Sequence, residues 1–230
     1  GNDRNTAKAN AGASGVLTSA LAFGGGSRDT TTESHNGSSW TNEGGLSAGK
    51  NTPQGAGLSE TSSLSISGDT AHNTYVTTVE EYNGSAWSSG DAVSIASSTA
   101  GYNGTNTSCM KTGGWNGSAI DDCETYNGSS WTTVAVLPLG NRRYAGYSGD
   151  ASSGINYTGD DGSSRYTSSE DWNGSSWSTG TSVSTGKTNH SFSGDTSTEA
   201  WFTGGNDGTQ YRTTTEEYQQ SLTARSVTAS

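Results

Sequence analysis

The chain has 230 residues, of which 27% are hydrophobic and 34 are glycine, and its formal net charge is −11. This acidity argues against nucleic acids and anionic membranes as partners, because both carry negative charge. No apolar run reaches the length of a membrane span, and the sequence shows no secretory signal peptide. A composition of this kind is also found in disordered chains, so the order of the residues has to distinguish a fold from disorder.

One pattern of residues recurs along the chain. An apolar segment closes on a glycine at steps of 44, 45, 46 and 45 residues, at Gly24, Gly68, Gly113, Gly159 and Gly204. A second motif ends in tryptophan in four units, at Trp40, Trp87, Trp131 and Trp177. A glutamate lies two residues before an aromatic position in every unit, at Glu33, Glu80, Glu124, Glu170 and Glu216. A fixed period of this length is typical of propeller blades or solenoid coils, in which each unit buries an apolar face against its neighbour.

The first unit shows the four strands that we expect in each repeat, around residues 7–15, 18–25, 30–35 and 38–41. Small residues dominate the first of them, which fits a strand close to a crowded central axis. The pair Asn36 and Gly37 between the last two strands predicts a type I′ hairpin, in which both central residues take positive φ. No segment has the apolar spacing of a helix.

Five such units predict an all-β fold, a five-bladed β-propeller that forms one domain over residues 1–230. The approximate blades are residues 1–44, 45–89, 90–134, 135–179 and 180–230. The four repeated tryptophans are expected to stabilise the ring, because each buries a large apolar area. The fifth unit has EYQQSL from Glu217, without the turn and without a tryptophan, so we expect blade 5 to open first.

Closure of the ring is ambiguous in the sequence. The first-strand motif occurs as Thr6, Ala7 and Lys8 and again as Thr223, Ala224 and Arg225, and both copies cannot fill one slot. Either the tail forms the outer strand of blade 5, or it continues into another module or a neighbouring protomer. The chain opens on glycine, so a fragment or a processed product is expected, and an oligomer through the chain ends is one prediction.

The motifs are clearest from Met110 to Arg142, in the segments CMKTGGW, CETYNGSSW and LPLGNRR. They resemble the kelch repeat, and at the level of the propeller the resemblance covers nearly all of the chain. Two units depart from the kelch diglycine, with SISGD and NYTGD, and only one unit keeps Leu-Pro. The segment EYNGSAW is also similar to kelch-like repeats in structural and tail-fibre proteins of bacteriophages, including marine ones. This second resemblance implies a place on a virion or in another extracellular assembly.

The two cysteines, Cys109 and Cys123, are expected on the second and third strands of unit three. The midpoint of their numbers falls at residue 116 in the intervening loop, so antiparallel pairing would set them opposite each other, within reach of a disulfide. Such a bond implies an oxidising compartment or exposure outside the cell. The alternative is two free, buried thiols.

An enzyme is not expected. Kelch propellers include copper-radical oxidases, whose Tyr, Cys and His ligands converge on the axis, but His35, His72 and His190 lie in different units without a shared motif. The repeated glutamates occupy equivalent positions, which predicts a repeated structural hydrogen bond and not a single catalytic site. We therefore expect no catalytic residue, no bound metal and no cofactor. Calcium at the acidic loops 159–164 and 204–208 is the alternative to ordinary turns there.

Binding residues are expected where the units differ, because the repeated residues are accounted for by the fold. The loop between the second and third strands varies most, and it carries Tyr75, Trp115, Arg165, Tyr166, Tyr211 and Arg212. On one face of a ring these side chains would suit sugar rings, although each aromatic also has the alternative role of covering its own blade. The leading hypothesis is a non-enzymatic adhesion module that contacts surface glycans. A purely structural virion or fibre component, in contact with other virion proteins, and a secreted lectin are the alternatives.

Overall fold

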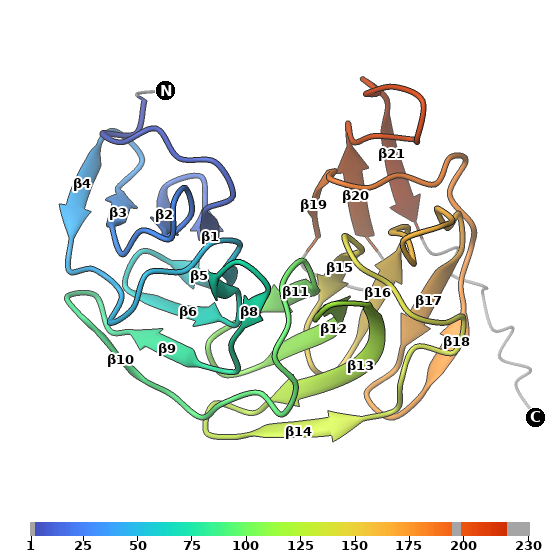
Figure 1. Ribbon diagram of the computed structural model, residues 1–230, viewed down its shortest axis with the longest axis horizontal. Coiled ribbons are helices and arrows are strands. Elements are labelled where there is room, and N and C mark those ends of the chain that lie inside the picture. The colour runs from blue at the N-terminus through green and yellow to red at the C-terminus, as the bar shows by residue number, and fades with distance from the viewer. Residues whose placement is uncertain (1–2, 195–198, 220–230) are drawn as a thin grey trace, which may run out of the picture.

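The computed structural model describes residues 3–194 and 199–219 and confirms the predicted all-β fold. Five antiparallel sheets stand around a central axis as a five-bladed β-propeller (Figure 1). The described residues contain no helix. The second copy of the first-strand motif, Thr223 to Arg225, lies outside the described residues.

The blades follow one another in chain order, and in each the strands run outward from the axis. Blade 1 consists of β1 (Gly12–Val16), β2 (Ser19–Phe23), β3 (Thr32–His35) and β4 (Trp40–Glu43). Blade 2 consists of β5 (Gln54–Ser59), β6 (Ser62–Ile66), β9 (Val79–Tyr82) and β10 (Trp87–Ser89), with a small hairpin of β7 (Asp69–Ala71) and β8 (Thr74–Tyr75) between its second and third strands.

The remaining three blades repeat this order. Blade 3 consists of β11 (Gly101–Gly104), β12 (Cys109–Trp115), β13 (Ala119–Tyr126) and β14 (Trp131–Val134). Blade 4 consists of β15 (Gly146–Gly149), β16 (Gly154–Tyr157), β17 (Ser169–Trp172) and β18 (Trp177–Thr179). Blade 5 has three strands within the described residues, β19 (Ser191–Ser193), β20 (Glu199–Thr203) and β21 (Thr215–Gln219).

The innermost strands use small residues because neighbouring backbones approach closely there. A Cβ atom added to Gly55 of β5 would lie 2.0 Å from the carbonyl oxygen of Ala13 in β1. At Gly12 of β1 the added atom would lie 2.8 Å from the carbonyl oxygen of Pro53, just before β5. Real side-chain atoms do not tolerate such distances, so these glycines allow adjacent blades to meet at the axis.

The Asn-Gly turns differ from the predicted type I′ geometry. Gly37 has a φ of 90°, whereas Asn36 is not among the residues with positive φ. The Asn36 side-chain oxygen instead accepts hydrogen bonds from the backbone N–H groups of Ser38 and Ser39, each at 3.0 Å. Because Trp40 pairs with His35, the loop has four residues, and asparagine is used for its side-chain acceptor rather than for its backbone.

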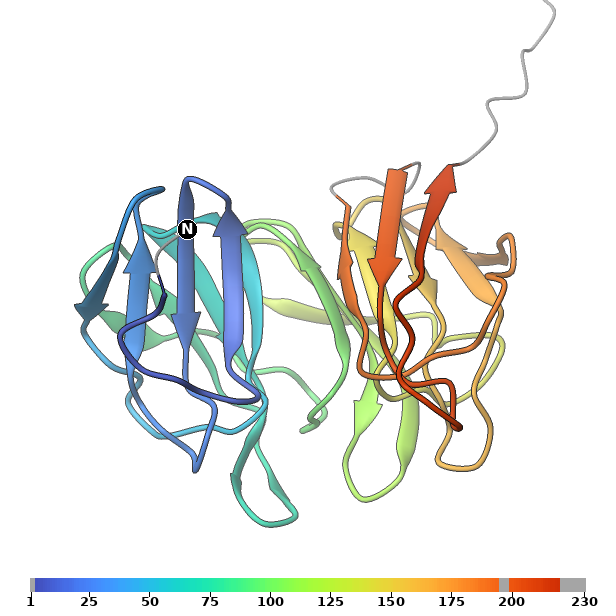
Figure 2. The same ribbon diagram turned by 90° about the horizontal axis from the view of Figure 1, so that it is seen from above.

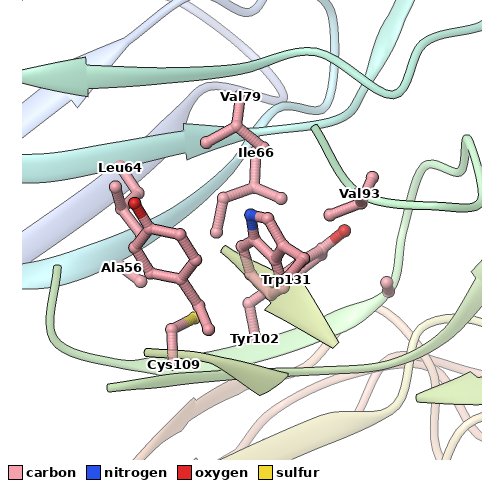
Figure 3. Close-up of a cluster of buried hydrophobic side chains, with 10 residues drawn as sticks. Ala56, Leu64, Ile66, Val79, Val93, Tyr102, Cys109 and Trp131 are labelled. Atoms are coloured by element: carbon pink, nitrogen blue, oxygen red, sulfur yellow. The ribbon is translucent and has the colours of Figure 1, made fainter. Parts of the chain in front are cut away.

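The blades pack through four buried clusters, one at each junction between consecutive blades. We call the side of a blade toward the next blade in the chain its forward face, and the opposite side its rear face. At the junction of blades 2 and 3, Leu64 and Ile66 of the forward face meet Tyr126 and Trp131 of the rear face. Figure 3 shows Leu64, Ile66 and Trp131 in this cluster. Leu21 and Phe23 meet Tyr82 and Trp87 in the same way between blades 1 and 2.

The repeated tryptophans lie on the rear faces. Trp131 is buried, while Trp87 and Trp177 are partly buried, and the indole N–H groups of these last two donate hydrogen bonds to the preceding blade, to Thr32 Oγ1 and to the carbonyl oxygen of Ala135. Trp40 lies on the first blade of the described residues and packs on His35 under the Arg4 guanidinium.

The predicted disulfide between Cys109 and Cys123 is wrong, since both cysteines are free, buried thiols. In the pairing of β12 with β13, Cys109 lies opposite Tyr126 and Cys123 lies opposite Thr112. The true centre of the hairpin is therefore displaced from residue 116, and the pairing shifts once more between Thr112 and Gly114. The two thiols consequently point to opposite faces of blade 3, Cys109 toward blade 2 and Cys123 toward blade 4.

The ring is open between blade 5 and blade 1. Two perpendicular views show these blades apart, with the chain passing from one to the other the long way around the axis (Figures 1 and 2). A cavity of about 900 Å³ lies at the axis and is lined by the innermost strands of blades 1, 2, 3 and 5 and by Tyr144 and Ala145, just before the innermost strand of blade 4. Its lining includes Trp201 of blade 5 and Val16 of blade 1, so it extends to the open side.

Candidate functional site

The repeated glutamates fix the segments that lead into each blade. Each carboxylate accepts a hydrogen bond from a backbone N–H of the segment just before the first strand of its own blade, at distances of 2.7–2.9 Å. The donors are Asn5 for Glu33, Ser47 for Glu80, Ser94 for Glu124, Leu139 for Glu170 and Ser184 for Glu216. These segments and the loops between the second and third strands lie at the same end of the blades. The hydrogen bonds therefore fix the backbone at the end of the propeller that carries those loops.

Each of these carboxylates also has a cation beside it, which the sequence interpretation missed. The pairs are Arg4 with Glu33, Lys50 with Glu80, Lys111 with Glu124, Arg142 with Glu170 and Lys187 with Glu216. Burial lowers the pKa of Lys50 and that of Arg142, and the neighbouring glutamates oppose this effect. A signal was present in the sequence, because Lys50, Arg142 and Lys187 each lie just before a first strand.

The candidate binding residues lie at this end of the propeller, and some of them form a continuous row. The Arg143 guanidinium stacks over the Trp115 ring at 4.4 Å and donates a hydrogen bond to Asp160 at 2.7 Å. Arg165 then reaches from the Asp160 loop to blade 5 and donates to the Asn206 carbonyl oxygen at 3.1 Å. We call these five residues, Trp115, Arg143, Asp160, Arg165 and Asn206, the loop strip.

The loop strip crosses three consecutive blades and is partly accessible. Arg165 is exposed, Trp115, Arg143 and Asn206 are half-buried, and a shallow hollow of about 70 Å³ lies between Arg143, Asp160 and Arg165. The strip therefore offers an aromatic ring, two guanidinium groups and a carboxylate side by side. Sequence reasoning found Trp115 and Arg165 but missed Arg143, which lies in a linker and not in a variable loop.

The other predicted residues are close to this strip or separate from it. Tyr166 donates a hydrogen bond to Asp161 and packs against the buried Arg142 guanidinium at 4.8 Å. Tyr211 is 78% exposed beside Asn206, with which it forms a backbone bridge, and Arg212 pairs with Asp207. Tyr75 lies in the β7–β8 hairpin of blade 2, and its hydroxyl donates a hydrogen bond to Asn73 Oδ1 of the same hairpin. The structure thus brings five of the six predicted residues into one region and leaves Tyr75 outside it.

The acidic loops use their carboxylates for turns. Asp161 accepts hydrogen bonds from the N–H groups of Ser163 and Ser164, and Asp207 accepts them from Thr209 and Gln210. These bonds hold the pKa values of both aspartates below the usual range. Over residues 3–194 and 199–219, no three His, Cys, Asp or Glu side chains converge in a metal-binding arrangement.

The axial cavity is lined by His190 of blade 5, whose pKa is strongly perturbed. Its imidazole contacts Thr158 Oγ1 at 3.3 Å and packs among Tyr157, Phe192 and Phe202. Burial, with a contribution from the nearby Lys187 charge, lowers the pKa of His190 to about 4. The ring is neutral at pH 7, and no carboxylate or second imidazole accompanies it among the residues that line the cavity.

Comparison with known proteins adds no assignment. No protein-family model matches the chain, and a search of curated proteins gave no relative. Within the described residues, no helix is long and apolar enough to cross a membrane.

Proposed function

We propose that this propeller is a non-enzymatic recognition module that binds surface glycans through the loop strip, as part of a phage particle or another extracellular assembly. The row from Trp115 through Arg143, Asp160 and Arg165 to Asn206 carries this proposal. Sugar rings are recognised by aromatic faces that contact their C–H groups and by planar polar side chains that bind pairs of hydroxyls. The strip supplies both kinds of group, held together across three blades by a cation–π contact and by hydrogen bonds.

The rigidity of the strip supports binding. Arg143 is held by Trp115 and Asp160, and Arg165 is held by Asn206, so a ligand would meet groups that are already placed and would order few side chains. The resemblance of the repeats to kelch motifs, and to kelch-like repeats of phage structural proteins, supports a kelch-type propeller with a place on a virion, fibre or other extracellular surface.

The test is binding of the labelled chain to a broad glycan array and to a matched panel of bacterial cells. We expect selective, saturable binding that falls about tenfold or more on Trp115→Ala or Arg165→Ala, as for central contact residues. Tyr75→Ala is the matched control, because it removes an aromatic from an equivalent loop outside the strip. A blank array with folded protein, or equal losses in the Tyr75 variant, would contradict glycan binding by the strip.

A further inference from the structure

The forward face of blade 5 carries the residues of a blade junction, yet no blade within residues 3–194 and 199–219 covers it. In the pairing of the second and third strands, Trp201 lies opposite Glu217. The same positions hold Leu64 and Glu81 in blade 2, and Ile155 and Asp171 in blade 4. Trp201 therefore occupies the position of the apolar residue at the centre of a forward face.

Exposure separates Trp201 from its equivalents. In blades 1 to 4 the corresponding residues are Leu21, Leu64, Met110 and Ile155, and all four are 0% exposed. Trp201 is 43% exposed. A tryptophan at this position, in a chain with so few hydrophobic residues, leaves a large apolar area in water where every other blade has covered it.

Glu217 adds a polar group with a defined role in the closed junctions. The hydroxyl of Tyr126 in blade 3 donates a hydrogen bond to Glu81 at 2.6 Å, and the hydroxyl of Tyr218 in blade 5 donates to Asp171 at 3.2 Å. In both cases the tyrosine is on the third strand of the following blade. Glu217, exposed next to Trp201, is the acceptor that such a tyrosine would meet.

We propose that this forward face, formed by Trp201, Thr203, Thr215 and Glu217, is a docking surface for a further β-blade of the same repeat type that is carried by a partner protein. The partner blade would present a tyrosine on its third strand and an aromatic residue on its fourth strand, as blade 3 does with Tyr126 and Trp131. Its place is the open side of the ring, which lies beside the axial cavity that Trp201 already lines.

Blade 1, on the other side of the opening, presents the matching kind of face. Its rear side carries His35 and Trp40, at the positions where blades 2 and 3 use Tyr82 with Trp87 and Tyr126 with Trp131. The Arg4 guanidinium covers Trp40 at 5.7 Å from the ring centre and pairs with Glu33. Because Trp40 is covered and Trp201 is not, blade 5 provides the stronger site for the partner.

The test uses the full chain and a carrier protein fused to residues 91–134, the sequence of blade 3. We expect saturable binding that weakens about tenfold or more on Trp201→Lys or Glu217→Lys in the chain, and on Tyr126→Phe in the carrier fusion. Tyr211→Ala, which removes an exposed aromatic elsewhere on blade 5, should leave the affinity unchanged. The proposed glycan binding is read separately on the array, so the failure of one proposal does not imply the failure of the other.

A second arrangement covers the case in which the separate blade is too unstable to bind. The same residues 91–134 are joined by a flexible linker after residue 230, which makes docking intramolecular. With fluorotryptophan labelling, the Trp201 resonance, assigned by Trp201→Phe, should lose its solvent isotope shift. If neither the carrier fusion nor the tethered blade protects Trp201, the proposal is overturned. It is also overturned if the chain alone forms oligomers that Trp201→Lys dissociates, since a second copy would then be the occupant.

Discussion

The Tyr126 hydroxyl donates a 2.6 Å hydrogen bond to Glu81 Oε1 across the junction of blades 2 and 3. The Tyr126 side chain is buried in the cluster that also contains Leu64 and Trp131. This bond therefore joins two blades through a charged acceptor in a largely apolar surrounding. Burial, followed by the Glu81 carboxylate, raises the pKa of Tyr126 above its usual range, so the phenol stays protonated and donates this hydrogen bond at neutral pH.

Tyr126→Phe should lower the free energy of unfolding by about 1.5–3 kcal/mol, the usual contribution of a hydrogen bond to a charged group. Urea unfolding followed by tryptophan fluorescence measures this change. Tyr75→Phe is the control, because its hydroxyl makes an exposed hydrogen bond of 3.4 Å to Asn73 in the same hairpin, and it should change stability by less than about 0.5 kcal/mol. Equal effects of the two substitutions would show that the bond across the junction contributes little.

Glu124→Gln should destabilise the protein by about 3–5 kcal/mol, because it leaves the fully buried Lys111 ammonium without its counter-charge. The two groups are 3.5 Å apart and both are buried. The double variant Lys111→Met, Glu124→Gln removes the stranded charge and should recover much of the loss. Chemical denaturation of the two single variants and the double variant gives the coupling energy, and additive effects would contradict a direct interaction.

Stability should fall as the pH is lowered from about 6.5 to about 4 because of His190. Its pKa is about 4 in the folded protein and 6.5 for the ordinary group, so the unfolded chain binds the proton first. The contribution of the unprotonated His190 ring to the free energy of unfolding is fully present above pH 6.5. It is lost as the pH falls to the pKa of the folded protein, and the loss amounts to at most about 3 kcal/mol. His190→Gln should flatten the pH dependence of urea unfolding, whereas His72→Gln, in an exposed turn, should not. An NMR titration that places the His190 pKa near 6.5 would refute this.

Both cysteines should be unreactive in the folded protein. Burial raises the pKa of Cys123 to about 12 and that of Cys109 further, which leaves almost no thiolate at pH 8. A thiol reagent should therefore detect no thiol in native buffer and two thiols in urea without a reductant. Only one or no thiol in urea would mean that a disulfide forms after all.

The repeats determined the architecture of this protein by themselves. The spacing of Gly24, Gly68 and Gly113, together with the strand patterns between them, is enough to predict blades, because each unit has to bury one face against the next. The candidate loops could be predicted for the same reason, since the residues that break the repeat are not required by it. Trp115 and Arg165 were found in this way.

Only the tertiary structure decided the pairing of particular side chains. A shift of β12 against β13 placed Cys109 and Cys123 on opposite faces, which no count from a presumed loop centre reveals, because strand register depends on the bulge near Gly113 and on packing against both neighbours. Arg143 lies in a linker of the sequence, and only the folding of the chain brings it beside Trp115 and Asp160 in the loop strip. The exposure of Trp201 could be learned only from the structure. Its position has the same register in every blade, and the residue there is buried only where another blade covers it.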